Sequence, residues 1–116
     1  MPGKRTERVG ESIRDVIAEL VLKEVKDPRV HMVTVTEVQM TNDLRHGRVF
    51  FSCVGDEAAH QRAASGFASA VGFIRREVSR RLSLRYTPDL TFVFDPRLET
   101  AERLADLLKD SGTREE

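Results

Sequence analysis

EAAHQRAASGFASAVGFIRREVSRRLSLR, residues 57–85, carries a helical pattern that contains no proline. Its apolar residues recur every three or four positions, as they do on one face of a helix, at Ala63, Phe67, Ala70, Ile74, Val78 and Leu82. An unbroken helix over residues 57–83 would be about 40 Å long. A compact domain of this size is only about 35 Å across, so such a helix would protrude from it. We therefore expect a break at Gly72, since glycine destabilises helices and permits unusual backbone angles.

The two halves of this segment differ in chemistry. The half before Gly72 is mostly Ala, Ser and Gly, which allows a neighbour or a ligand to approach the backbone closely. The half after it is rich in arginine, with only Glu77 in opposition, at Arg75, Arg76, Arg80, Arg81 and Arg85. On a helical projection Arg76 and Arg80 lie opposite the apolar stripe. This cationic face suits phosphate binding, although a solvated face that keeps the helix soluble has the same pattern.

Composition predicts one cytoplasmic domain. The chain has 116 residues, of which 40% are hydrophobic, enough for a modest core. It has no run of about 20 apolar residues to span a bilayer, and its N-terminal residues lack the apolar core of a signal peptide. Cys53 is the single cysteine, so no internal disulfide is expected.

Charge is distributed unevenly along the chain. The formal net charge is zero, yet residues 72–86 contain five arginines and one glutamate, a local sum of +4. Residues 95–116 contain seven acids and four bases, a local sum of −3. An arginine-bearing element in a neutral chain can still bind RNA as a local patch.

The remaining segments predict three strands and two more helices. A helix begins near Lys4 to Glu7 and runs to Lys26, where Asp27-Pro28 ends it. Its apolar stripe is Val9, Ile13, Val16, Ile17, Leu20, Val21 and Val25. Residues 32–40 and 48–54 form a hairpin around the turn 41–47. The apolar alternation shifts phase between Val35 and Val38, which predicts either a bulge or burial on both faces. Residues 90–94 form a third strand. Asp95-Pro96 then has the form of an N-cap followed by proline, and an apolar stripe from residue 101 to 108 predicts a short C-terminal helix.

This order of elements defines the expected fold. We expect an α+β protein, a two-layer α/β sandwich in which helices pack on one face of a three-stranded sheet. The order α-β-β-α-kink-α-β corresponds to the type II KH arrangement of RNA-binding domains. Residues 1–110 are expected to form this single KH-like domain, and residues 111–116 a disordered end.

Several stretches, in order and spacing, resemble the bacterial ribosome-binding factor A family. They are Arg8-Val9 with residues 25–29 (VKDPR), residues 33–36 (VTVT) with 42–44 (NDL), residues 70–75 (AVGFIR) with 82–85 (LSLR), and residues 88–95 (PDLTFVFD). The resemblance covers about residues 5 to 108. In that family an Ala-x-Gly kink replaces the Gly-x-x-Gly loop of other KH domains, and Ala70-Val71-Gly72 matches the kink.

The resemblance implies a non-enzymatic, cytoplasmic factor that binds the free small (30S) ribosomal subunit. Such factors assist late maturation of 16S rRNA and matter most for growth in the cold. RNA contacts are then expected at the kink, from Ser69, Ala70, Val71 and Gly72. Phosphate contacts are expected from Arg75, Arg76, Arg80, Arg81 and Arg85. Outlying contacts are expected from Lys4, Arg5, Arg8, Arg45 and Arg48. Arg75 and Arg81 flank the apolar stripe, so a structural role over the sheet edge is also open to them. A monomer without a cofactor, a metal or a small-molecule substrate is the simplest expectation.

Three other functions compete with this one. An enzyme is disfavoured because the three histidines are scattered and no nucleophile is spaced with a base. A protein-interaction module without RNA binding is compatible with the zero net charge and the few aromatic residues. A stand-alone single-stranded RNA binder is the third possibility, and it would bind short oligonucleotides well.

Overall fold

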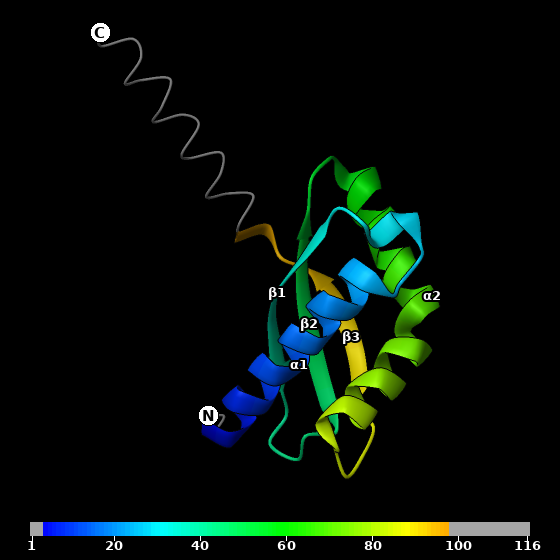
Figure 1. Ribbon diagram of the computed structural model, residues 1–116. Helices are drawn as coiled ribbons and strands as arrows, with labels where there is room; N and C mark the ends of the chain where they lie inside the picture. The colour runs from blue at the N-terminus through cyan, green and yellow to red at the C-terminus, as the bar shows by residue number, and fades with distance from the viewer. Residues whose placement is uncertain (1–3, 98–116) are drawn as a thin grey trace, which may run out of the picture.

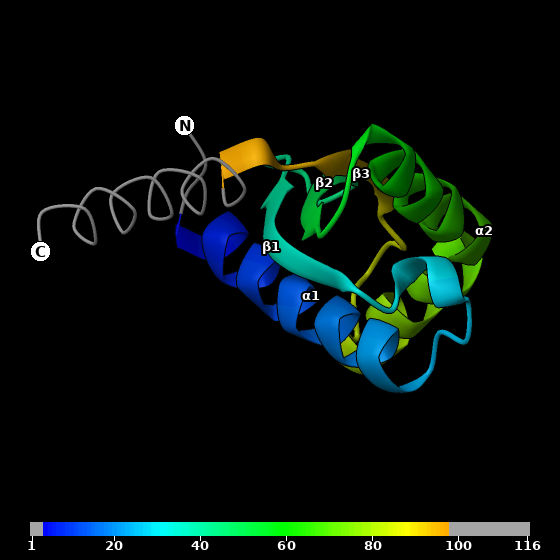
Figure 2. The same cartoon turned by 90° about the horizontal axis from the view of Figure 1, so that it is seen from above.

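The computed structural model describes residues 4–97 as a three-stranded sheet with two helices packed on it (Figure 1). The elements are α1 (Lys4–Lys23), the short 3-10 helix η1 (Pro28–Val30), β1 (Val33–Met40), β2 (His46–Cys53), α2 (Glu57–Leu82) and β3 (Asp89–Phe94). Both helices lie on the same side of the sheet when it is seen from above (Figure 2). The expected α+β, two-layer architecture is thus confirmed. The predicted C-terminal helix and the end at 111–116 lie outside the described residues.

The sheet is mixed, with strand order β1-β2-β3. β1 and β2 form the predicted antiparallel hairpin, and the register shifts between Val35 and Glu37, which confirms the predicted bulge. β2 pairs with β3 in parallel, from His46↔Asp89 to Phe51↔Phe94. Parallel neighbours need a long crossover, and α2 supplies it. As a result the turn between β1 and β2 and the loop between α2 and β3 lie at the same end of the sheet.

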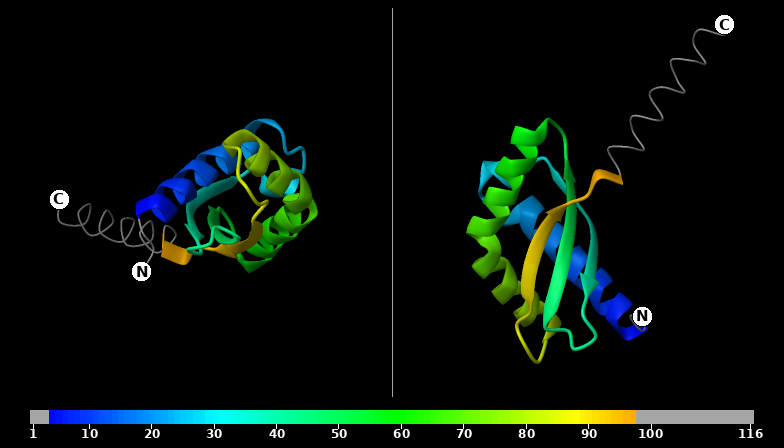
Figure 3. Two further views of the ribbon diagram at one scale, coloured as in Figure 1. Left: turned by 90° about the horizontal axis from the view of Figure 1, so that it is seen from below. Right: turned by 180° about the vertical axis from the view of Figure 1, so that it is seen from behind.

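The predicted break at Gly72 is wrong, because α2 is one helix of 26 residues from Glu57 to Leu82. It follows a curved course along the sheet without interruption (Figure 3). The loop that carries η1 supports the first half of α2, so the long helix is not left protruding. Gly66 makes that contact possible, since a Cβ there would lie 2.8 Å from Val30 Cγ1 and 3.0 Å from Arg29 Cβ. The small residue at position 66 therefore allows η1, a neighbour within the chain, to pack closely against α2.

The core lies between the sheet and the predicted stripes of the two helices. Ile13, Ile17 and Leu20 of α1 are fully buried, as are Phe67 and Ile74 of α2. Aromatic rings join α2 to the strands. The Phe67 ring stacks on Phe92 with centroids 4.3 Å apart and tilts against Phe51 at 5.1 Å. Periodicity alone thus placed the buried faces of both helices correctly.

A buried carboxylate fastens the bulge of β1 to the end of β3. Asp95 is only 3% exposed, and it accepts hydrogen bonds from the Thr36 hydroxyl (2.9 Å) and the Arg97 backbone N–H (3.0 Å). The Arg97 guanidinium also pairs with Asp95 and reaches Glu37 at 3.0 Å. The hydrogen bonds from Arg97 hold the pKa of Asp95 well below its ordinary value of 3.8. This cluster closes the sheet at the end away from the hairpin turn.

Candidate nucleic-acid interface

Three segments that are distant in sequence meet at the end of the molecule where the hairpin turns: the start of α1, the turn between β1 and β2, and the end of α2 with its loop (Figures 1 and 3). Thr6 of α1 lines one groove with Thr41 and His46 of the hairpin. Arg8 lines a small pocket with Leu82 and Leu84, at the end of α2. We call this region the basic end. It is defined by Lys4, Arg5, Arg8, Arg45, Arg76, Arg80 and Arg85.

Local backbone geometry brings the end of α2 to this place. Ser83 takes the left-handed conformation (φ 51°) and caps the helix by donating its N–H to Arg80 C=O. The Leu84 N–H donates to Ser79 C=O at 3.1 Å, which satisfies a carbonyl of the last turn. The chain is thereby turned toward the hairpin, where the Asp89 N–H donates to Arg45 C=O at 2.8 Å.

Three of the five arginines predicted to follow Gly72 pair with carboxylates of the protein, and two of them, Arg75 and Arg81, are half-buried. Arg75 Nε donates to Pro88 C=O at 2.8 Å, and its guanidinium pairs with Asp89 at 2.9 Å, which fixes the start of β3. Arg81 pairs with Glu24 after α1 and with Glu77 at 3.3 Å. These carboxylates raise the pKa of Arg81 further above its ordinary value. The structural role left open for Arg75 and Arg81 is the one that their contacts support.

The other arginines project from the surface. Arg80 pairs with Glu77 at 2.7 Å, yet its side chain is 68% exposed. Arg76 is exposed, and no ion pair joins it to an acid within residues 4–97. Arg45 and Arg85 lie against the Tyr86 ring, with Cζ 4.1 Å and 5.3 Å from its centroid. Lys4, Arg5 and Arg8 are exposed on the first turns of α1. These groups keep their hydrogen-bond donors available to a phosphate.

The four residues predicted to form a kink lie in the middle of α2, and the Arg76 guanidinium reaches back to within 3.4 Å of where a Cβ of Gly72 would lie. Because the helix is continuous there, the N–H groups of residues 69–72 belong to its hydrogen-bonded ladder and are not presented to a ligand. The Ser69 hydroxyl accepts a hydrogen bond from Arg29 at 3.1 Å. The prediction of exposed backbone at this point is therefore wrong, because no break frees it. Contact of RNA with the side chains of Ser69, Ala70 and Val71, or with the surface at Gly72, stays a prediction.

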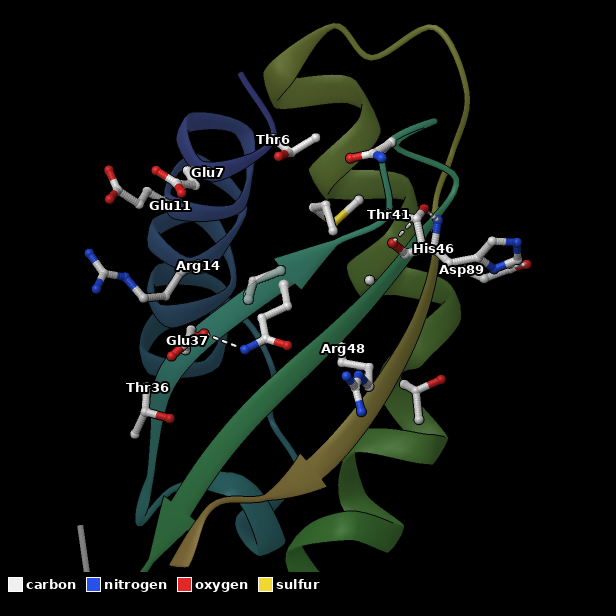
Figure 4. A pocket seen from close by; sticks show the side chains of 16 residues that line it. Thr6, Glu7, Glu11, Arg14, Thr36, Glu37, Thr41, His46, Arg48 and Asp89 are labelled. Atoms are coloured by element: carbon white, nitrogen blue, oxygen red, sulfur yellow. Dashed lines mark hydrogen bonds and ion pairs between the residues drawn. The ribbon is translucent and has the colours of Figure 1, made fainter. Parts of the chain in front are cut away.

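Arg48 lies farther along the groove that Thr6, Thr41 and His46 also line. It lies over the Phe50 ring, at 5.8 Å, and lines this groove on the open face of the sheet beside α1 (Figure 4). This groove has mixed charge, because four carboxylates stand among its bases: Glu7, Glu11, Glu37 and Asp89. A surface with this many acids is poorly suited to a polyanion. The four acids thus make Arg48 a weaker candidate for contact with RNA.

Sequence reasoning missed three residues that organise the molecule, one at the basic end and two elsewhere. Tyr86 follows Arg85, and a tyrosine beside an arginine is a combination that can contact RNA. Arg29 joins Asp27 to Ser69, and Arg97 joins β3 to β1. These two pairings are tertiary and have no local signal. Within residues 4–97 no group of three or more His, Cys, Asp or Glu side chains is placed to hold a metal ion, and no helix there is long and apolar enough to cross a membrane.

Comparison with known proteins gives a consistent result over the whole chain. The family model described as "Ribosome-binding factor A" matches residues 5–108. Ribosome-binding factor A of Geobacter metallireducens is 39% identical over 112 residues, which is 97% of this chain and 95% of that protein. The solution structure of a Thermotoga maritima protein, described as a putative ribosome binding factor A, has a TM-score of 0.70 at 25% identity. It covers 80% of this chain and 89% of that one.

A further structural neighbour is a Thermus thermophilus ribosome binding factor A homology model, fitted into a cryo-EM map of a complex between the 30S subunit and that factor. Its TM-score is 0.65 at 21% identity, and the match covers 78% of this chain and 96% of that one. At this level of identity the likeness concerns the fold.

Proposed function

Because this chain belongs to the ribosome-binding factor A family, which is non-enzymatic, we propose that it binds the small ribosomal subunit through the basic end. Binding of this kind serves ribosome maturation, and the RNA contacted there is 16S rRNA. The placement of the interface at the basic end rests on the different contacts that the arginines make. Arg75 and Arg81 are held by carboxylates, while Arg76, Arg45 and Arg85 are exposed without an ion pair in residues 4–97.

The zero net charge makes this local arrangement decisive. A neutral chain is not drawn to RNA by its overall field, so the affinity must come from the few cations that gather in one place. Each phosphate neutralised releases counterions, and the affinity then falls with salt in proportion to the number of contacts. We propose that the factor acts as a monomer in the cytoplasm on late precursors of the subunit, with its largest effect in the cold.

The test is co-sedimentation with small subunits, large subunits and joined ribosomes over a series of salt concentrations. Wild type is compared with Arg76→Glu and with the matched control Arg62→Glu. Both arginines are exposed on α2 and both variants change the charge equally, but residue 62 lies about 21 Å along the helix from residue 76. We expect wild type to bind small subunits in a salt-sensitive way. Arg76→Glu should lower the affinity about tenfold and reduce the salt slope by about 0.7–0.9.

The control and the competing outcomes are distinct. Arg62→Glu should bind as wild type does. Equal loss in the two variants would mean that overall charge acts, and the basic end would not be the interface. Binding to small subunits that ignores salt would favour a protein-interaction module. Tight binding to short oligonucleotides, with no preference for the particle, would favour a stand-alone RNA binder.

A further inference from the structure

We propose that Arg45, Tyr86 and Arg85 form one binding site for a phosphate group of an RNA strand, in which the tyrosine ring positions the two guanidinium groups. The inference rests on the proposed function and adds to it a defined subsite. Its basis is a cluster of two cations on one ring, with Arg45 Cζ 4.1 Å and Arg85 Cζ 5.3 Å from the centroid. The ring is 43% exposed, so burial in the core does not account for its presence.

The charges around the ring are unbalanced. No ion pair joins Arg45 or Arg85 to an acid in the described part of the chain. Two acids are near in sequence, and hydrogen bonds from Thr41 and Arg45 together with the charge of Arg45 lower the pKa of Asp43, but neither acid forms an ion pair with Arg45 or Arg85. Asp43 accepts hydrogen bonds from the Thr41 hydroxyl (2.6 Å) and the Arg45 backbone N–H (3.0 Å), and Asp89 pairs with Arg75 at 2.9 Å. Both guanidinium groups carry their positive charge close to the same ring, so a phosphate group beside the ring would be attracted by both.

The chemistry of the pair suits a phosphodiester. A guanidinium that stacks on an aromatic face keeps its in-plane N–H groups free, and these match the oxygens of a phosphate. The two loops that carry the site are also fastened to each other. Asp89 N–H donates to Arg45 C=O at 2.8 Å, and Arg75 Nε donates to Pro88 C=O at 2.8 Å. Little ordering is then needed when RNA binds, which favours affinity.

Tyr86 acts in this site as a positioning residue. We expect Tyr86→Leu to bind small subunits about two- to fivefold more weakly, the loss that corresponds to an exposed cation–π contact. Tyr86→Phe keeps the ring and should bind as wild type does. Arg45→Gln/Arg85→Gln removes both partners of that one phosphate and should reduce the salt slope by about 0.7–0.9. Far-UV circular dichroism and the urea midpoint of each variant verify that it is folded.

A double-mutant cycle gives the sharpest test. If Tyr86 acts only through the two arginines, then Tyr86→Leu should cost nothing further in the Arg45→Gln/Arg85→Gln background. The same loss in both backgrounds would overturn the proposal, as would Tyr86→Leu binding like wild type or Tyr86→Phe binding like Tyr86→Leu.

The two levels of inference fail in different ways. If wild type binds and Arg76→Glu weakens binding, while every variant of the cluster binds normally, the subsite is wrong and the proposed function stands. If wild type binds no small subunit at any salt concentration, the proposed function is wrong and the subsite falls with it.

Discussion

At the level of single residues, the two inner glycines of α2 have opposite surroundings. A Cβ at Gly66 would meet Val30 Cγ1 at 2.8 Å, and Val30 is fully buried. A Cβ at Gly72 would meet only the far end of the Arg76 side chain, at 3.4 Å. The sequence could show that glycine weakens a helix, but not which glycine faces a neighbour. The helix continues through Gly72 because buried residues on both sides of it, Phe67 and Ile74, hold it to the core.

Alanine substitutions should therefore act with opposite sign at these two positions. Gly72→Ala should stabilise the protein by about 0.5–1 kcal/mol, because alanine has the higher helix propensity and the space is open. Gly66→Ala should destabilise it by about 1–2 kcal/mol, because η1 must move to accept the methyl group. Urea unfolding measures both free energies. Stabilisation of similar size at both positions would show that η1 yields without cost.

Asp95 makes the stability of the fold depend on pH. Asp95→Asn keeps the shape and the ability to cap but removes the charge, and it should cost about 1–3 kcal/mol at pH 7. The pKa of Asp95 is lowered in the folded state, so its contribution is complete above about pH 4 and is lost as the pH falls below that value. The difference between wild type and variant should narrow by about 1 kcal/mol from pH 5 to pH 3. A constant difference in urea unfolding over this range would contradict the assignment.

At the level of elements, α2 carries two kinds of arginine on one helix. Arg81 joins α2 to the end of α1 through Glu24, whereas Arg76 points away from the core. Arg81→Gln should lower the urea midpoint and leave the salt slope of small-subunit binding unchanged. Arg76→Gln should reduce the salt slope and leave the urea midpoint unchanged. Urea unfolding and co-sedimentation of the two variants test this expectation. A reduced salt slope in Arg81→Gln would show that Arg81 contacts RNA.

The elements also show which structural features the sequence patterns could predict. Period and turn chemistry located α1, the hairpin, its bulge and β3, because each depends on residues that are close along the chain. The continuity of α2 depends on η1, and the engagement of Arg75 depends on Pro88 and Asp89. The cluster on Tyr86 depends on the parallel pairing of β2 and β3. Such features require the tertiary structure, so the list of candidate arginines could be predicted but not their roles.

At the level of the whole molecule, β2 separates the basic end from the opposite end. His46 and Cys53 stand at its two limits, about 23 Å apart at 3.3 Å per residue. In a Cys53→Ser background, an iron chelate that generates hydroxyl radicals can be attached at Asn42→Cys in the hairpin turn or at Val54→Cys beyond the far end. Cleavage of 16S rRNA in the small subunit should be strong from position 42 and weak from position 54. Strong cleavage from position 54 and weak cleavage from position 42 would place the interface at the opposite end of the molecule and contradict the proposal.

The parallel pairing of β3 with β2 also has a consequence for synthesis of the chain. The hairpin and α1 can form as soon as they have been made, but the contact between Asp89 and Arg45 must wait for the last strand. A nascent chain that stops before residue 89 therefore lacks the closed basic end, although it already contains most of the arginines. If the basic end is the interface, the protein should bind RNA only when its synthesis is nearly complete, and unfinished copies should not compete for the particle on which the finished copies act.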